Sequence, residues 1–373
     1  MKRFFLRIIL FLCASSAAAQ KYKIEGSAPD MEGKTVYLGE MKSRNKFEKV
    51  DSALVSGGLF RMEKPLPGVK RITILIGSST KTFLLDENPI YITYLLKEEQ
   101  VKGKSIRLPE ITVRGDKDQE LFELMTKTLS QEMYAMLAIS FMGKDKDVNA
   151  PENKVLADSI GEIYIMAKEQ TRKTFDSIVT HYPDSYVSGL ILNDFLAKER
   201  PVTEMQNLYG LLSDRVKRSN IGQTLKRTIQ AMLAVGVGKQ APDFMLETPE
   251  GEKLLLSALR GKCVLIDFWA SWCAPCLREA PNIKRVYEKY RDSGFEVLSV
   301  SLDKKNDQWK QAIQKHRLDW LHVSSLQGWK CPVARLYQVS AIPAMFLVDR
   351  EGNIVSTEAR GEMLEQEVEK LCK

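Results

Sequence analysis

The sequence predicts an α/β domain at the C-terminus, preceded by a small antiparallel β domain and an α-helical segment. Three observations predict this order. Strand-like runs separated by turn residues fill residues 20–115, and apolar residues at helical spacing follow in residues 116–235. Strands then alternate with helices in residues 236–373, a pattern typical of a central sheet with helices on both faces. A chain of 373 residues is long enough for these parts.

Residues 1–19 are typical of a cleaved secretory signal. Three basic residues precede a short apolar run, and alanines at positions 17–19 supply the small residues expected before a cleavage point at Gln20. The run is shorter than the roughly 20 apolar residues that a membrane span needs. We therefore expect export across the inner membrane into the periplasm. We expect no lipid anchor on Cys13, because the preceding Leu12 is not small.

The β domain is expected from β-branched and aromatic runs separated by turn residues. The turns include two adjacent glycines and two proline-containing segments. The runs that predict strands are Thr35–Leu38, Ile72–Ile76, Thr82–Leu85 and Ile90–Tyr94.

The helical segment is expected from apolar residues that recur every three or four positions. Leu121, Leu124, Met125 and Leu129 form one such face, and a second begins at Ile160. The segment 182–185 predicts a break, residues 202–216 predict one further helix, and the polar stretch 144–153 predicts an exposed loop.

The C-terminal domain is expected from strands and helices that alternate along the chain. The predicted strands are 264–269, 295–302, 344–349 and 354–356, and the predicted helices are 273–290, 308–316 and 362–371.

Composition and charge narrow the classes of function. Charged residues make up 28% of the chain with both signs interspersed, and the formal net charge of +7 falls by three when the signal leaves. No basic stripe is interleaved with aromatic residues, so we expect no nucleic-acid partner. The three histidines are scattered, and the sequence offers no metal-ligand cluster. We therefore expect no metal and no cofactor.

The most specific motif in the chain is Trp272-Cys273-Ala274-Pro275-Cys276, which lies between a predicted buried apolar strand and the start of a predicted helix. Thiolates are the nucleophiles of disulfide exchange, and a helix N-terminus favours the thiolate of Cys273 over the thiol. Cys276 lies within one helical turn and can close a disulfide ring. Half of a zinc site is the alternative interpretation of Cys-x-x-Cys, but the remaining cysteines and histidines supply no second pair of ligands.

The exported chain has five cysteines, which are too few for disulfides to hold together a chain of this length. Three of them lie outside the Cys-x-x-Cys motif. We expect Cys263, which opens the central strand, to belong to the core. Cys331 is either a buried thiol or a third redox thiol. Cys372 has no assigned role.

The C-terminal region resembles the TlpA/ResA group of exported thiol–disulfide oxidoreductases in the thioredoxin superfamily. The resemblance rests on Ala241-Pro242-Asp243-Phe244, Asp267-Phe268-Trp269-Ala270, the Cys-x-x-Cys motif and Ala341-Ile342-Pro343. It implies a thioredoxin fold with an added strand–helix unit around residues 304–326. The region also resembles the related AhpC/TSA module. The front of the chain resembles an extension found before exported thioredoxin-like modules, which has no agreed activity.

The resemblance also implies roles for individual residues. Pro343 is expected to form a cis peptide bond opposite the cysteines, where the alternative is a plain strand-edge proline. Asp267 matches a buried acid that accepts a proton from Cys276. Glu279 matches an acid near the site in that group. A carboxylate desolvated at this position would have a raised pKa and could act as a general base near neutral pH. The alternative is a solvent-facing acid in the first helical turn. The residues expected to contact substrate are Trp272, Pro275, Ile342 and Pro343.

Together these features predict a periplasmic enzyme that exchanges disulfides with protein substrates. Cys273 would attack the substrate disulfide, and Cys276 would resolve the mixed disulfide. No basic residue lies between the cysteines, which favours a role as a reductant of substrate disulfides. We expect an upstream electron donor in the membrane or periplasm to keep the enzyme reduced. One alternative is a peroxiredoxin-like peroxide reductase, although Ala270 replaces the threonine that this chemistry needs. Another is a binding or scaffold protein with an accessory redox module. The sequence leaves the oligomeric state open.

Overall fold

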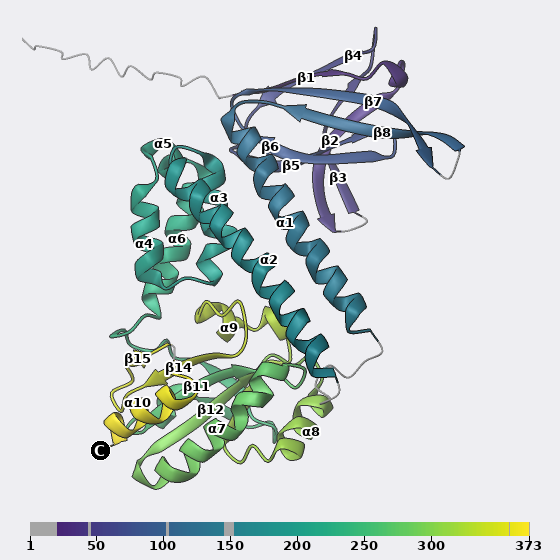
Figure 1. Cartoon of the computed structure of the whole chain (residues 1–373). Helices are drawn as coiled ribbons and strands as arrows, with labels where there is room; N and C mark the ends of the chain where they lie inside the picture. The colour runs from purple at the N-terminus through teal and green to yellow at the C-terminus, as the bar shows by residue number, and fades with distance from the viewer. Residues whose placement is uncertain (1–20, 44–45, 102–103, 145–152, 358, 373) are drawn as a thin grey trace, which may run out of the picture. The chain divides into compact units, whose positions relative to one another are not determined.

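The structure is a computed structural model, and it describes residues 21–43, 46–101, 104–144, 153–357 and 359–372. The expected signal at residues 1–19, Cys13 included, and nearly all of the expected loop at 144–153 lie outside the described residues. Contacts between Cα atoms divide the chain into two compact units (Figure 1). Of the described residues, the first unit comprises those up to 189 and those from 212 to 222, and the second comprises those from 190 to 211 and those from 223 onward.

The β region forms two four-stranded sheets, with strand orders β4-β1-β7-β8 and β3-β2-β5-β6 (Figure 1). Its elements are β1 Lys21–Ser27, η1 Pro29–Met31, β2 Thr35–Ser43, β3 Lys46–Leu54, β4 Leu59–Pro65, β5 Lys70–Ile76, β6 Ser79–Leu85, β7 Pro89–Val101 and β8 Lys104–Arg114. The two sheets share one hydrophobic core, to which Ile24 and Ile92 contribute from one sheet and Leu38 and Ile74 from the other.

The four strand-like runs of this region all fall inside observed strands. The pairing is antiparallel with one exception, because β1 runs parallel to β7. Parallel pairing needs a long connection between the two strands, which the chain provides here by building the other sheet in between.

The helical segment contains more helices than the sequence predicts. They are α1 Lys117–Met142, α2 Lys154–His181, α3 Tyr186–Asp194, η3 Leu196–Lys198, α4 Val202–Leu211, α5 Asp214–Arg218 and α6 Asn220–Ala234. The single helix expected over residues 202–216 is wrong, because α4 ends at Leu211 and α5 begins at Asp214. The Ser213 side chain accepts a hydrogen bond from the Val216 N–H and so starts the second helix.

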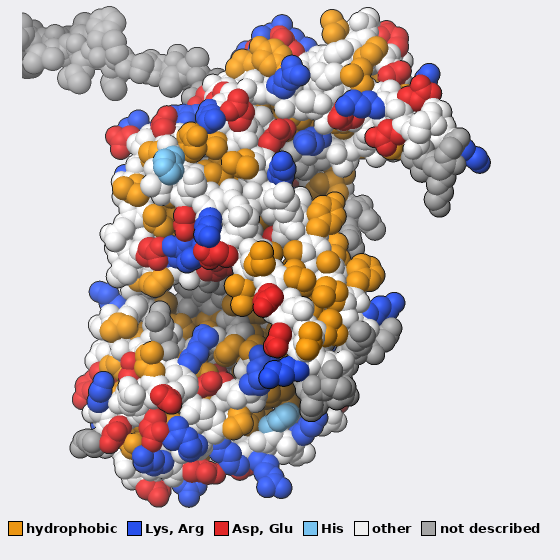
Figure 2. All heavy atoms as spheres, viewed as in Figure 1, with side chains coloured by type: hydrophobic (Ala, Val, Ile, Leu, Met, Phe, Trp, Pro, Cys, Tyr) orange, Lys and Arg blue, Asp and Glu red, His pale blue; other side chains and the backbone are white. Residues whose placement is uncertain are grey.

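Helices α1 and α2 leave much apolar surface uncovered. The buried residues of α1 lie between Asp118 and Thr128, whereas Tyr134 and Phe141 further along are 66% and 73% exposed. Ile165 and Met166 on α2 are 65% and 71% exposed. Figure 2 shows hydrophobic side chains gathered over this pair of helices. Exposed apolar patches of this kind commonly mark interaction surfaces.

The C-terminal region folds around a seven-stranded sheet with the order β10-β9-β13-β12-β11-β14-β15. Its strands are β9 Met245–Glu247, β10 Lys253–Leu255, β11 Cys263–Trp269, β12 Phe295–Ser301, β13 Leu321–Ser324, β14 Ala344–Val348 and β15 Ile354–Ser356. Its helices are η4 Leu256–Leu259, α7 Ala274–Tyr290, η5 Arg291–Ser293, α8 Asn306–His316, η6 Gly328–Lys330, α9 Pro332–Leu336 and α10 Glu362–Cys372.

Helices cover both faces of this sheet, which confirms the predicted α/β thioredoxin fold. On one face Val286 of α7 and Leu364 of α10 pack against Leu265 of β11, and the two helices lie side by side (Figure 1). On the other face, Trp309 of α8 and Val333 of α9 join a second core. The added unit expected at residues 304–326 is present as α8 and β13. Every residue of β11 is buried, as its central position requires.

Candidate active site

Cys273 and Cys276 form a disulfide at the start of α7. The bond joins sulfurs 2.03 Å apart, and the Cys273 side chain accepts a hydrogen bond from the Cys276 N–H at 3.2 Å. Cys273 is thus the N-cap residue of α7, where helix N–H groups favour negative charge. Pro275 lies in the first turn, where its missing N–H costs no hydrogen bond. The predicted redox pair is therefore at a position that stabilises a thiolate.

Ile342 and Pro343, which are also expected to contact substrate, lie just before β14, the strand that pairs with β11. The Ile342–Pro343 peptide bond is cis and directly precedes β14. Strand β14 pairs with β11, with Ala344 opposite Phe268, so the proline lies at the same end of the sheet as the loop to Cys273. Ile342 packs against the core that contains both cysteines. Trp272, by contrast, is 56% exposed.

Asp267 is buried on β11, the central strand of the sheet. Its carboxylate accepts a hydrogen bond from the Ser299 hydroxyl at 3.0 Å, and Trp320 Nε1 donates to the same hydroxyl at 2.9 Å. Burial raises the pKa of Asp267 to about 7, and the nearby charge of Glu279 acts in the same direction, while Ser299 and Arg360 act in the opposite one. A carboxyl group that titrates near neutrality can accept or release a proton during exchange.

Glu279 is half-buried and held in place, which argues against the solvent-facing alternative. Its Oε1 accepts hydrogen bonds from Asn282 Nδ2 at 2.8 Å and from the Gly361 N–H at 2.9 Å. It lies beyond the first turn of α7, in which no acidic residue occurs. Through its charge, Glu279 also contributes to the raised pKa of Asp267.

Two features of the site were missed by sequence reasoning. Asp303 is buried and accepts hydrogen bonds from the N–H and hydroxyl of Ser271, at 3.0 and 2.6 Å, which fixes the loop before Trp272. The signal for it was a carboxylate two residues beyond the end of a buried strand, β12, which neighbours β11. Trp329, 45% exposed, lies with its ring centre 6.4 Å from that of Trp272. No pattern in the sequence pointed to this aromatic pair.

The remaining cysteines in the described part of the chain are free thiols. Cys331 is fully buried at the N-cap of α9, and Cys263 is fully buried at the start of β11. Cys372, at the end of α10, is partly buried.

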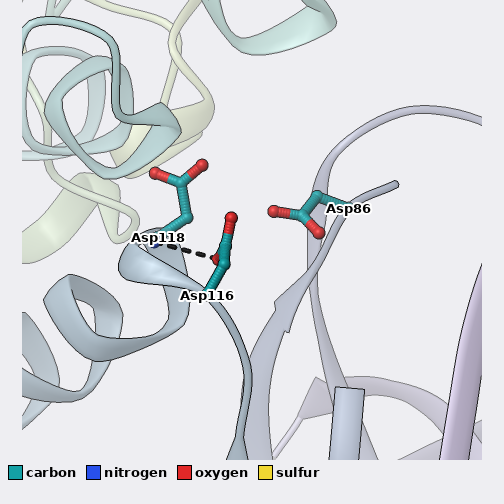
Figure 3. A group of neighbouring side chains, drawn as sticks. All are labelled: Asp86, Asp116 and Asp118. Atoms are coloured by element: carbon teal, nitrogen blue, oxygen red, sulfur yellow. Dashed lines mark hydrogen bonds between the residues drawn. The ribbon is translucent and has the colours of Figure 1, made fainter. Parts of the chain in front are cut away.

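Three aspartates also gather in the first unit, a grouping that the sequence did not predict. Asp86, Asp116 and Asp118 have carboxylate oxygens within 4.8 Å of one another (Figure 3). Asp118 already pairs with Arg215 at 3.0 Å and accepts the Tyr186 N–H at 3.0 Å. Asp116 caps α1 by accepting the Asp118 N–H at 3.0 Å. These contacts give the group a structural role in starting α1.

A Cys-x-x-Cys disulfide at a helix N-terminus, beside a cis-proline on a thioredoxin fold, defines a thiol–disulfide oxidoreductase. A family model described as the AhpC/TSA family matches residues 237–357, and one described as a domain of unknown function (DUF4369) matches residues 22–122. The chain belongs to the ResA-like thiol–disulfide oxidoreductases of the thioredoxin superfamily.

The curated relatives match only part of the chain. The thiol-disulfide oxidoreductase ResA of Bacillus thuringiensis subsp. konkukian is 30% identical over 137 residues, which cover 37% of this chain and 77% of the relative. ResA of Geobacillus kaustophilus is 33% identical over 137 residues, with 37% and 76% covered.

Solved structures show a similar partial match. The thioredoxin domain of a thiol-disulfide oxidoreductase from Bacteroides vulgatus is 33% identical and covers 37% of this chain and 99% of its own, with a TM-score of 0.36. A structure described as a putative thiol:disulfide interchange protein DsbE from Chlorobium tepidum is 31% identical, with 37% and 99% covered and a TM-score of 0.35.

Among the residues that the structure describes, no helix has both the length and the hydrophobicity of a membrane span.

Proposed function

We propose that the chain is a periplasmic oxidoreductase that reduces or exchanges disulfides in protein substrates. The observation that carries the proposal is the Cys273–Cys276 disulfide at the N-terminus of α7. In the reduced enzyme, the Cys273 thiolate attacks one sulfur of a substrate disulfide and releases the other as a thiolate. The Cys276 thiolate then attacks the Cys273 sulfur and releases the second substrate thiol. The substrate gains two electrons, and the enzyme retains the disulfide.

Asp267 acts in the second step as the acceptor of the Cys276 proton. Its burial and its pKa of about 7 support this role, because a carboxylate with an ordinary pKa would be a much weaker base. Glu279 assists by keeping the pKa of Asp267 high through its own charge. We expect Asp267→Asn to slow resolution of the mixed disulfide. A resolution rate that is unchanged in the variant from pH 6 to 9 would exclude the role.

Substrate contacts are assigned to the residues around the disulfide. Trp272 and Pro275 are exposed beside it, and Ile342 and Pro343 precede the strand that pairs with β11. An extended substrate segment could lie against this surface while the mixed disulfide forms. These four residues are therefore the proposed substrate-binding residues.

The order of the two cysteines can be tested by trapping. With Cys276→Ser, we expect substrates to stay covalently attached to Cys273 through a mixed disulfide, because no second thiol remains to release them. Added reductant should cleave these adducts. The matched control is Cys273→Ser, which should trap nothing. Adducts that accumulate on Cys276 in the control instead would reverse the proposed roles.

The direction of electron flow is proposed to be reductive. The residues between the cysteines, Ala274 and Pro275, offer no positive charge to stabilise a thiolate further. We expect a reduction potential nearer the value of about −270 mV known for thioredoxin than the value of about −120 mV of a strong periplasmic oxidant. The role also requires an upstream electron donor in the membrane or periplasm. A potential near the oxidant's value would instead assign the enzyme to disulfide formation.

Export and domain limits are part of the same proposal. We propose a signal at residues 1–19, a β domain at 20–115, a helical region at 116–235 and the thioredoxin-like domain at 236–373. Mass spectrometry of the protein recovered from the periplasm should show Gln20 as the first residue. Recovery of the uncleaved chain from the cytoplasm would refute export.

The front of the chain is proposed to present partners or substrates to the redox domain. The exposed apolar side chains of α1 and α2 support such a surface. A chain from which residues up to about Val235 are deleted should still reduce insulin while losing any phenotype that depends on the partner. If it also retains the phenotype, the N-terminal region has no such role.

Stoichiometric peroxide consumption by the full chain would instead favour the peroxidase alternative.

A further inference from the structure

A second pair of cysteines meets at the opposite end of β11 from the active site. Cys263 is the first residue of β11 and is fully buried, and Cys372 is the last residue of α10. The Cys263 thiol donates a hydrogen bond to the carbonyl oxygen of Leu371 at 3.5 Å. This contact places Cys263 directly beside the end of α10.

The two thiols are also neighbours of one another. Cys372 packs against the hydrophobic cluster to which Cys263 belongs. Burial raises the pKa of the Cys372 thiol to about 12, and a side-chain hydrogen bond with Cys263 contributes to the same direction. Both cysteines are free thiols in this structure. Neither is used by the exchange chemistry at Cys273 and Cys276.

We propose that Cys263 and Cys372 form a second disulfide, which fastens the end of α10 to the start of β11. The proposal goes beyond the exchange reaction and does not depend on it. The Cys263–Leu371 contact joins residues 108 positions apart, so the cross-link would close most of the C-terminal domain into one loop. Cross-links that close long loops restrict the unfolded chain most strongly.

The oxidant for this step is a disulfide, either a small molecule such as oxidised glutathione or the active-site disulfide of another copy. The Cys372 thiol is the more accessible one, and its thiolate attacks one sulfur of the oxidant and releases the other as a thiolate, which takes up the proton that Cys372 lost. Cys263 then loses its proton and attacks the Cys372 sulfur, which releases the second thiol. Two electrons pass from the cysteine pair to the oxidant. Because thiolate is scarce at neutral pH when the pKa is high, the reaction is slow there.

The cross-link would brace a helix that reaches the active site at its other end. Immediately before α10, the Gly361 N–H binds Glu279, and the Arg360 guanidinium donates to the Pro343 carbonyl oxygen at 2.5 Å. Along its length, α10 buries Leu364 in the core that it shares with α7. With a disulfide at Cys372, α10 would therefore be held at its C-terminal end as well as at its N-terminal end.

The test uses the full exported chain carrying Cys273→Ser and Cys276→Ser, so that only the remaining cysteines can react. The reduced protein is incubated with oxidised glutathione at about pH 8.5, where more thiolate is present than at neutrality. It is then blocked with N-ethylmaleimide, digested and analysed by mass spectrometry. We expect a peptide pair linked through Cys263 and Cys372, with Cys331 recovered as the alkylated form. Recovery of both Cys263 and Cys372 as alkylated or glutathionylated forms, with no linked pair, would overturn the proposal.

Thermal unfolding supplies a second readout. In the same background, oxidation should raise the Tm of the transition followed by tryptophan fluorescence by roughly 5–15 °C. The increase should disappear after reduction and in the variant that also carries Cys372→Ser. The matched control is Cys331→Ala, which removes a thiol elsewhere and should keep the difference between the oxidised and reduced forms. Equal Tm values for the oxidised and reduced forms would contradict a cross-link in the folded protein.

Discussion

Replacing Asp267 by asparagine should stabilise the oxidised protein at neutral and alkaline pH. The carboxyl group has a pKa of about 7 in the folded protein and an ordinary value of 3.8 in an unfolded chain. A difference of about three corresponds to about 4 kcal/mol, since each pKa unit is worth ~1.36 kcal/mol. The asparagine amide would be close in shape to the protonated acid and could still accept the hydrogen bond from Ser299.

The effect should depend on pH in a defined direction. Below about pH 4 the acid is protonated in both states, so wild type and variant should have similar free energies of unfolding. Between about pH 4 and 7 the unfolded chain releases the proton while the folded protein keeps it, so wild-type stability falls as pH rises. Above about pH 7 the full penalty of about 4 kcal/mol applies, and the variant should be more stable by that amount.

Urea unfolding followed by tryptophan fluorescence measures this difference. All five tryptophans lie between residues 269 and 329, so the signal reports on the unit that contains Asp267. Ser299→Ala is a useful control, because it removes the hydrogen bond and leaves the buried charge in place. A stability difference between wild type and Asp267→Asn that is constant from about pH 4 to 8 would refute the reasoning.

Three further predictions follow from contacts in the two units. Glu279→Gln should lower the pKa of Asp267, because the charge of Glu279 raises it; the fall in stability would then end at a lower pH, and an unshifted profile would contradict the coupling. Asp303→Asn should destabilise the second unit by about 1–3 kcal/mol and slow insulin reduction, because the hydrogen bonds that hold the Ser271 loop are weakened. An unchanged midpoint of urea unfolding would show that the loop does not need the carboxylate. Arg215→Met should destabilise the first unit, because it leaves the buried Asp118 carboxylate without its ion pair. Since Arg215 is partly exposed, the loss should lie near the lower end of ~3–5 kcal/mol. Circular dichroism should report this loss, while the unfolding transition followed by tryptophan fluorescence stays unchanged.

The redox site was predictable from local sequence because its parts are local. The strand from Cys263 to Trp269, the helix that begins after Cys273 and the three-residue spacing of the two cysteines are all encoded within residues 263–290. The hydrophobic pattern was sufficient there, since a run that is apolar except for Asp267 is typical of a strand buried on both faces. The cis-proline needed the resemblance, because X–Pro bonds of either isomer have the same sequence.

The unpredicted features depend on residues distant in sequence. Glu279 binds the N–H of Gly361, and the backbone amide that holds it carries no side-chain signature. The parallel pairing of β1 with β7 depends on how the second sheet folds between them. The break between α4 and α5 depends on the capping of one serine, Ser213, within an otherwise helical period. Local spacing carries no information about such partners.

The loop before α10 has a consequence for the order in which the site is assembled during synthesis. Gly361 follows Glu279 by 82 residues, and β14, which borders β11, also follows both cysteines. A nascent chain that has exposed Cys273 and Cys276 therefore has neither the cis-proline strand nor the amide that holds Glu279. The exchange site is therefore complete only after the segment through Gly361 has been synthesised and folded.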